Sequence, residues 1–112
     1  MDDDENFLDA ARVALERDGL IVAGVAGNRS AALRQVAELR PDVVLVDIRL
    51  GEESGFDVVR DLAAGGHASR LVMISSYAGA DYADLIDEAP VAGFVPKTEL
   101  SGAAVRRVLG MV

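Results

Sequence analysis

Acidic, hydroxyl and lysine side chains stand at four places in the sequence where they could act together on a phosphoryl group. Asp47 and Lys97 each follow an apolar run, Ser75 follows another, and three aspartates come directly after Met1. Clustered carboxylates repel one another until a divalent cation joins them, and Mg²⁺ prefers one or two carboxylates together with phosphate oxygens and water. A carboxylate beside that ion can attack phosphorus and form an acyl phosphate. The metal, the lysine ammonium and a serine hydroxyl could then each neutralise or bind one phosphoryl oxygen.

Each of these residues also has an ordinary explanation when it is taken alone. A single aspartate at the end of a strand is commonly a turn former or a helix cap, and acidic residues before a helix suit the helix dipole. Serines are common in turns, and a lone lysine is usually surface charge. The single histidine, His67, lies in a glycine-rich turn and receives no role. What favours a shared site is that three of the groups fall at the same end of successive apolar runs, and that the aspartates precede the first helix, where the carboxyl end of a missing first strand would lie.

Four apolar runs are the elements that must position these groups. Each run is nearly continuous rather than alternating, which is typical of strands in a parallel sheet that is covered by helices on both faces. We expect strands at residues 20–25, 43–48, 71–74 and 93–95.

Helical patterns lie before, between and after the apolar runs. The first places Phe7, Leu8 and Leu15 on one stripe and ends before Gly19, where a C-cap is expected. For the second, Asn28 or Ser30 is suited to be the N-cap. We expect helices at residues 5–17, 30–39, 55–64, about 81–89 and 100–109. This alternation predicts an α/β fold with a doubly wound parallel sheet, in which the site lies beyond the carboxyl ends of the strands.

The composition limits the classes of protein that the chain can belong to. With 112 residues we expect one domain, residues 1–112, and with no cysteine there are no disulfides and no thiolate chemistry. There is no secretory signal and no run long enough to span a membrane, so a cytoplasmic location without membrane contact is expected. A net charge of −8 argues against direct binding to nucleic acid. It suits a protein that contacts other proteins or gathers carboxylates around a cation.

Two segments of the chain resemble response-regulator receiver domains of bacterial two-component systems, the CheY-like superfamily. The segment RPDVVLVDIRLGEESGFDVVRDL is similar to the family's phosphoacceptor strand and the loop after it, with Asp47 as the acceptor and Gly55 as the loop glycine. The opening DDDENFL is similar to the acidic pair that holds Mg²⁺. Asp2 and Asp3 match that pair best, and Asp4 stands where the family often has a polar residue.

Two further segments extend the resemblance over nearly the whole chain. LVMISS resembles the fourth strand of the family with its switch hydroxyl, which falls at Ser75, or at Ser76 if the register slips by one residue. GFVPK matches the fifth strand, with Phe94 at the aromatic switch position and Lys97 as the lysine that contacts phosphate. No single motif is specific, but the four together are.

The resemblance implies a flavodoxin-like (βα)5 fold with strand order 2-1-3-4-5 and a signalling function rather than an enzymatic one. A histidine kinase or phosphotransfer protein would donate a phosphoryl group to Asp47 in the presence of Mg²⁺, and Arg49 would offer its backbone carbonyl to the ion. Ser75 and Phe94 would then move and remodel the face built from the fourth helix, fifth strand and fifth helix. The side chains of Arg49 and Tyr77 would flank the site.

The chain departs from the family because the apolar strand expected before the acidic pair is absent. Only Met1 precedes Asp2. The family's order places that strand in the middle of the sheet, so its loss would leave a gap between the strands at 20–25 and 43–48. Burial of four or five side chains, each contributing roughly 1.5–3 kcal/mol, would be lost. We therefore expect a receiver truncated by about one strand, in which the natural chain begins earlier or another segment or subunit fills the gap. Asp2 and Asp3 depend most on that strand.

Two alternatives stay open from the sequence. The first is a receiver-like module that is not phosphorylated and acts through protein contacts alone; its Mg²⁺ affinity would separate it from an active receiver. The second is an enzyme or cofactor carrier on a similar fold. Glycine-rich phosphate loops are absent, a dehalogenase-type site would need a second aspartate where Arg49 stands, and only Tyr77 and Tyr82 could stack on a flavin. The downstream partner is either a separate protein or a missing output domain, and a homodimer is compatible with both.

Overall fold

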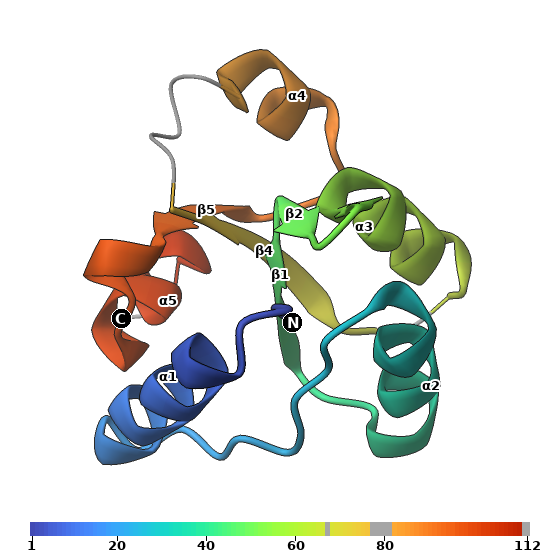
Figure 1. Ribbon diagram of the computed structural model, residues 1–112. Helices are drawn as coiled ribbons and strands as arrows, with labels where there is room; N and C mark the ends of the chain where they lie inside the picture. Colours follow the sequence, from blue (N-terminus) through green and yellow to red (C-terminus); the bar gives the residue numbers. More distant parts are fainter. Residues whose placement is uncertain (67, 77–81, 111–112) are drawn as a thin grey trace.

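The computed structural model describes residues 1–66, 68–76 and 82–110 and has a parallel sheet between two layers of helices (Figure 1). The sheet contains β1 (Val43–Asp47), β4 (Arg70–Ser75) and β5 (Gly93–Pro96) in the order β1-β4-β5, with both neighbouring pairs parallel. Asp47 is in register with Ile74, so the carboxyl ends of β1 and β4 lie side by side. The positions of His67 and Tyr77 fall outside the described residues.

The helices begin close to where the hydrophobic pattern places them. They are α1 (Glu5–Arg17), α2 (Arg29–Leu39), α3 (Gly55–Ala64), α4 (Ala83–Glu88) and α5 (Gly102–Val108), with a short 3-10 helix at Lys97–Glu99. Four of the five α-helices start at a capping side chain that accepts backbone N–H groups, supplied by Asp4, Asn28, Ser54 and Ser101. None of the helices in the described ranges is long and apolar enough to cross a bilayer.

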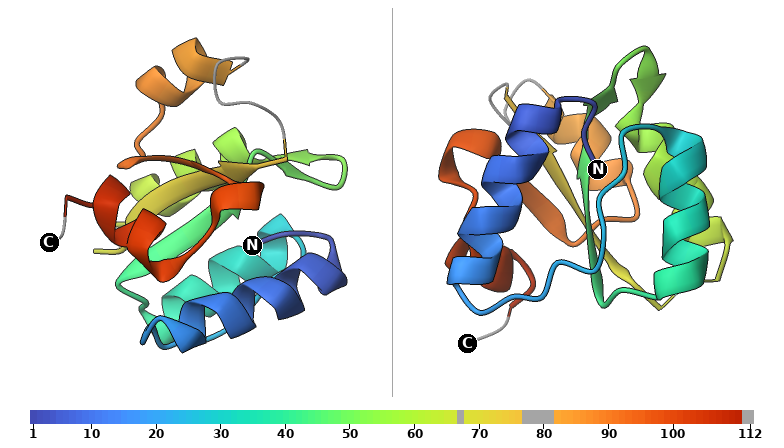
Figure 2. Two further views of the ribbon diagram at one scale, coloured as in Figure 1. Left: turned by 90° about the vertical axis from the view of Figure 1, so that its left-hand side faces the viewer. Right: turned by 60° about the horizontal axis from the view of Figure 1, so that its bottom comes forward.

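Two apolar clusters hold the helices on the sheet, one on each face. The first joins α2 and α3 to one face of β1 and β4, with Val36, Val46 and Val59 buried at its centre. The second joins α1 and α5 to the opposite face, around Val72 and Ile74. The views in Figures 1 and 2 show the same division, with α1 beside α5 and α2 beside α3.

The sequence-based prediction of a strand at residues 20–25 is wrong. These residues form an extended but irregular connection between α1 and α2 (Figure 2), and Ile21 in their middle is 93% exposed. The physical reason is that a strand needs a hydrogen-bonded neighbour, and only Met1 and Asp2 lie between this connection and β1. The five-strand order 2-1-3-4-5 is therefore not confirmed, although β1, β4 and β5 follow one another as its last three members would.

A small antiparallel pair that the sequence did not predict follows the end of β1. It consists of β2 (Arg49–Leu50) and β3 (Glu53–Ser54), joined through Gly51 in the left-handed region at φ +60°. This pair turns the chain back so that α3 begins directly against the end of β1.

Candidate functional site

Asp47 is fixed at the end of β1 by the backbone around it. Its N–H donates to the Met1 carbonyl at 3.0 Å, and its side-chain Oδ1 accepts from the Arg49 N–H at 3.2 Å. The first residue of α3 is Gly55, whose N–H donates to the Ile48 carbonyl at 2.7 Å. A Cβ at position 55 would lie only 1.8 Å from the Asp47 carbonyl oxygen. The glycine in the sequence motif is therefore needed for α3 to approach the end of the strand.

Asp2 is held at the site by backbone contacts of the first two residues. The Met1 ammonium donates to the Leu45 carbonyl at 2.7 Å, and the Asp2 N–H donates to the Ala26 carbonyl at 3.0 Å. The Asp2 carboxylate accepts from the Asp4 N–H at 2.9 Å, and the Asp2 residue is 0% exposed. These contacts join the first two residues to β1 on one side and to Ala26 on the other. Asp2 therefore has a defined position, although the sequence analysis expected it to depend on a missing strand.

Three carboxylates converge at this end of the sheet. Oxygens of Asp2, Asp3 and Asp47 lie within 4.8 Å of one another; Asp2 and Asp47 are buried and Asp3 is exposed. Asp2 Oδ2 is buried and makes no hydrogen bond within the described chain apart from an ion pair with Lys97. Oxygen ligands around Mg²⁺ stand roughly 3–4 Å apart, since each lies about 2.1 Å from the ion. Small side-chain rotations would bring these oxygens to such spacings, so the residues fit a hard divalent cation.

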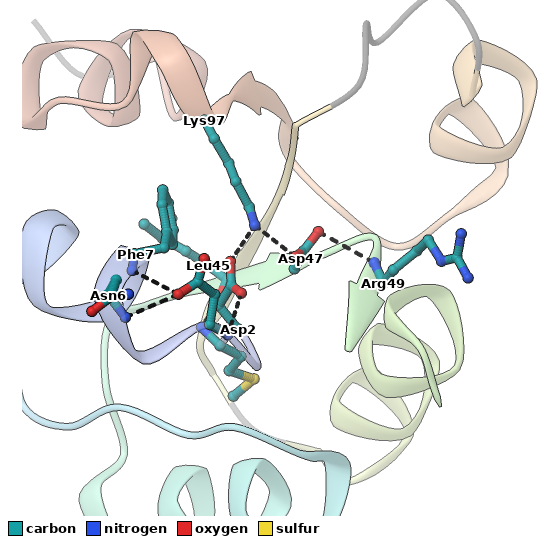
Figure 3. A network of polar contacts seen from close by, with 9 residues as sticks. Asp2, Asn6, Phe7, Leu45, Asp47, Arg49 and Lys97 are labelled. Atoms are coloured by element: carbon teal, nitrogen blue, oxygen red, sulfur yellow. Dashed lines mark hydrogen bonds and ion pairs between the residues drawn. The ribbon is translucent and has the colours of Figure 1, made fainter. Parts of the chain in front are cut away.

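Lys97 reaches into the acidic cluster from the end of β5 (Figure 3). Its Nζ lies 2.8 Å from Asp47 Oδ2 and also forms an ion pair with Asp2 Oδ2. The same Nζ stands 4.5 Å from the centre of the Phe7 ring, close enough for a cation–π contact. Sequence reasoning assigned Phe7 only to the apolar stripe of the first helix. Its position three residues after Asp4 gave no separate signal for this role.

The surroundings of these groups shift their proton affinities. Burial raises the pKa of Asp47, although the hydrogen bonds from Lys97 and from the Arg49 backbone oppose the shift. Burial alone would lower the pKa of Lys97, but its hydrogen bonds and ion pairs with Asp2 and Asp47 outweigh it and raise that pKa. Burial lowers the pKa of the Met1 amino group to about 6. The lysine therefore stays charged and balances the carboxylates around it.

The other predicted residues lie at or near the carboxyl ends of the strands. Ser75 is the last residue of β4, is 2% exposed, and is in register with Pro96, the residue before Lys97. Ser76, the alternative switch position, follows the strand and is exposed. Phe94 is partly buried and packs against the cluster formed with α2 and α3. The Arg49 side chain is exposed and points away from the acidic cluster (Figure 3), while its N–H contacts Asp47.

Comparisons with known proteins agree with this geometry. The family model described as the response regulator receiver domain matches residues 1–108. The chain therefore belongs to the response regulator receiver domain family. Its fold superimposes with a TM-score of 0.80 on the signal receiver domain of the putative response regulator NarL from Mycobacterium tuberculosis, at 28% identity over 97% of this chain and 92% of that one.

Curated relatives are longer proteins of which this chain matches one part. It is 36% identical over 87 residues to a protein-glutamate methylesterase/protein-glutamine glutaminase of Nocardioides sp., which is 76% of this chain and 24% of that protein. It is 42% identical over 64 residues to the DNA-binding response regulator MtrA of Mycolicibacterium smegmatis, which is 57% of this chain and 28% of that protein. The chain thus spans less than a third of the length of these two relatives.

Proposed function

We propose that the chain is a phosphoacceptor receiver in which Asp47 takes a phosphoryl group from a histidine kinase or phosphotransfer protein. The observation that carries this proposal is the convergence of the Asp2, Asp3 and Asp47 carboxylates with the Lys97 ammonium at one end of the sheet. Receiver family membership supports the same reading, because the residues at these positions are those that the family motif requires. The chain would act in the cytoplasm as a switch and not as a turnover enzyme.

The chain's own groups can perform the transfer. An oxygen of the ionised Asp47 forms the new O–P bond while the P–N bond of the donor phosphohistidine breaks and the imidazole keeps that electron pair. Lys97 already touches the carboxylate, so its ammonium needs only a small movement to pair with a phosphoryl oxygen. The Ser75 hydroxyl, one residue beyond the register partner of Asp47, would bind another oxygen.

Mg²⁺ would be held by Asp2, Asp3 and Asp47, together with the backbone carbonyl of Arg49. The bound ion would neutralise phosphoryl oxygens during transfer. In its absence the Lys97 ammonium serves as the counter-charge of the two buried carboxylates, which explains why they can stand so close together. Ion binding at this place therefore requires Lys97 to loosen its pairs with Asp2 and Asp47.

Signal output would pass through a protein contact. Once the phosphoryl group is in place, Ser75 would move towards it and Phe94 would turn further inward. The face formed by α4, β5 and α5 would then change shape for a downstream protein or for an output domain joined to the receiver. The longer relatives include a methylesterase and DNA-binding regulators, and either kind of output is compatible with the chain. A homodimer is also compatible with the chain.

The proposal is tested by intact-mass measurement after incubation with Mg²⁺ and acetyl phosphate. The native chain is expected to gain one phosphoryl group, and Asp47→Ala is expected to gain none. Asp84→Asn is the matched control, because Asp84 is exposed on α4 and away from the acidic cluster. It should be phosphorylated like the native chain.

The alternative of a silent receiver makes the opposite prediction. A native chain that is folded by circular dichroism but gains no mass, and whose melting temperature does not respond to Mg²⁺, would refute the phosphoacceptor function. A response to Mg²⁺ without a gain in mass would retain the metal site and reject the transfer chemistry.

A further inference from the structure

The Lys97 ammonium lies against partners of two different kinds. Its Nζ stands 2.8 Å from Asp47 Oδ2 and is also paired with Asp2 Oδ2. The same atom lies 4.5 Å from the centre of the Phe7 ring. An ammonium has three N–H groups, so it can face both carboxylates and the ring at the same time. The Lys97 side chain is only 13% exposed, so these groups take the place of much of the water that would otherwise surround the charge.

The start of α1 fixes the position of the Phe7 ring. The Phe7 N–H donates at 3.3 Å to the side chain of Asp4, the N-cap of the helix. The Asp4 N–H in turn donates to Asp2 Oδ1 at 2.9 Å. The ring is half-buried and packs against the apolar cluster of α1 and α5, and Figure 3 shows it beside the Lys97 side chain. One short segment of backbone therefore carries both the Asp2 carboxylate and the ring to the same ammonium.

The carboxylates and the ring respond differently to a divalent cation. Mg²⁺ at the acidic cluster would compete with Lys97 for the oxygens of Asp2 and Asp47, because the ion prefers oxygen ligands. The Phe7 ring has no net charge and no oxygen, so the ion does not compete for it. Lysine has a flexible four-carbon stem, and an ammonium released by both carboxylates would turn towards water unless something else held it. The ring is the partner that stays while the carboxylates are exchanged.

We propose that Phe7 is a positioning residue for phosphoryl transfer, whose ring keeps the Lys97 ammonium beside Asp47 after the cation has taken over the carboxylates. This inference rests on the proposed function, since it needs Asp47 to accept the phosphoryl group. Phe7 acts through Lys97 and does not touch the reacting atoms. The transfer rate depends on how often the ammonium is in position when the donor arrives, so a contact that keeps it in position raises the rate.

Replacing the ring separates this role from simple packing. The attraction comes from the negative face of an aromatic ring, so leucine would fill similar space without it, whereas tyrosine would retain it. Phe7→Leu should therefore slow transfer from acetyl phosphate at saturating Mg²⁺ by roughly 3-fold to 30-fold, the range that a cation–π contact of a partly desolvated ammonium gives. Phe7→Tyr should stay within about twofold of the native rate.

The first experiment measures this rate by intact mass, normalised to the folded fraction from circular dichroism. It compares Phe7→Leu with the native chain and, separately, adds Phe7→Leu to Lys97→Gln. Without the ammonium the ring has nothing to hold, so Phe7→Leu should change the rate of Lys97→Gln by less than about twofold. Leu15→Val is the packing control, because Leu15 is buried in the same cluster about two turns further along α1. It should lower the melting temperature and keep the transfer rate of the folded chain.

A second experiment observes the ammonium directly. Lys97 is the only lysine in the sequence, so a chain made with ¹³C-labelled lysine gives an NMR signal from this residue alone. Protons over the face of an aromatic ring are shifted upfield. The Cε protons of Lys97 should therefore lie upfield of their position in Phe7→Leu, both without Mg²⁺ and at saturating Mg²⁺.

The results distinguish the positioning role from the phosphoacceptor function. Slower transfer by Phe7→Leu only where Lys97 is present, with an upfield signal that persists in Mg²⁺, is expected. Equal rates for Phe7→Leu and the native chain overturn the positioning role and leave the phosphoacceptor function standing. Equal slowing with and without Lys97 assigns Phe7 to packing and also overturns it, as does a signal that moves to its Phe7→Leu position when Mg²⁺ binds. A native chain that gains no phosphoryl group refutes the phosphoacceptor function, and the positioning role with it.

Discussion

Replacing Gly55 by alanine is expected to move the candidate phosphoacceptor. Position 55 begins α3 directly against the end of β1, and an added Cβ would stand 1.8 Å from the Asp47 carbonyl oxygen and 2.8 Å from its carbonyl carbon. Real Cβ atoms essentially never come nearer than 3.0 Å to such atoms, so strand and helix must separate by at least 1.2 Å, the difference between 3.0 and 1.8 Å. Both neighbours are backbone, which has no rotamer to adopt.

The size of the effect has two parts. Forcing a methyl group into a packed contact costs about 1–3 kcal/mol. Separation also stretches the 2.7 Å hydrogen bond from the Gly55 N–H to the Ile48 carbonyl, which contributes a further ~1 kcal/mol. The free energy of unfolding should therefore fall by about 2–4 kcal/mol. A displacement of about 1 Å at the attacking group should slow phosphoryl transfer by on the order of 100-fold.

Two assays follow this variant. Urea denaturation at pH 7 gives the free energy of unfolding, and the rate of mass gain with acetyl phosphate and Mg²⁺ gives the transfer rate. Gly27→Ala is the matched control, because a Cβ there would meet only the Asp2 carbonyl oxygen at an ordinary 3.7 Å. That control should change stability by less than about 1 kcal/mol.

Either of two results would refute the reasoning. If Gly55→Ala keeps the stability of the native chain to within the change seen for Gly27→Ala, the close approach of α3 to β1 does not exist. If stability falls but the folded fraction is phosphorylated at the native rate, the backbone position of Asp47 does not control transfer.

Three further predictions concern charged groups, two of them at the site and one at the contact between α1 and α5. Lys97→Gln leaves Asp2 and Asp47 without their counter-charge, so stability without Mg²⁺ should fall by about 3 kcal/mol and saturating Mg²⁺ should restore part of it, as measured by urea denaturation. The Met1 amino group has its pKa lowered to about 6; between pH 6 and 8 the unfolded chain binds more protons than the folded chain, so metal-free stability should rise with pH. Asp18→Ala removes the carboxylate that accepts from the first N–H of α5 and should lower the melting temperature, with a loss of about 1–2 kcal/mol.

Each of these predictions has its own control. Lys97→Arg keeps the positive charge and should retain more stability than Lys97→Gln. Acetylation of the amino terminus removes the titrating group while leaving an N–H for Leu45, so the rise between pH 6 and 8 should disappear; a rise that persists would assign it to another group. Asp9→Ala, at an exposed position on α1, should leave the melting temperature within a degree or two of the native value, about the shift of a neutral surface change.

Much of the fold could be predicted because hydrophobic periodicity and local capping signals agree with the tertiary structure. The helix predicted at residues 5–17 is observed as Glu5–Arg17, and Asn28 caps the second helix as one of its two suggested candidates. The strands predicted at 43–48, 71–74 and 93–95 appear as β1, β4 and β5, with small differences at their ends. These elements carry their own signals in sequence.

The prediction of a strand at residues 20–25 is wrong because a strand depends on more than its own sequence. Its apolar, β-branched sequence is suitable for a strand, but strand formation depends on a neighbour, and periodicity within one segment does not report whether that neighbour exists. The antiparallel pair β2 and β3 was not predicted, because strands of two residues are too short to show a periodic pattern.

Part of the candidate site could likewise be predicted from sequence, and part of it depends on the tertiary structure. The convergence of Asp2, Asp3, Asp47 and Lys97 was predicted because parallel strands bring their carboxyl ends together, and the structure brings these groups to one place. The roles of the Met1 backbone and of the Phe7 ring were not predicted. Both depend on where the first residues lie against β1 and β5, which is a tertiary property without a sequence motif.

The contact between the two terminal helices has a consequence for the order of folding. Asp18, at the end of α1, accepts from the Gly102 N–H and from the Arg106 side chain, across sequence separations of 84 and 88 residues. Synthesis runs from the amino end, so α1 is made before α5 and cannot form these contacts until residues 102–106 have left the ribosome. Until then the face of α1 that packs against α5 stays exposed, and it is open to chaperones and proteases during that interval.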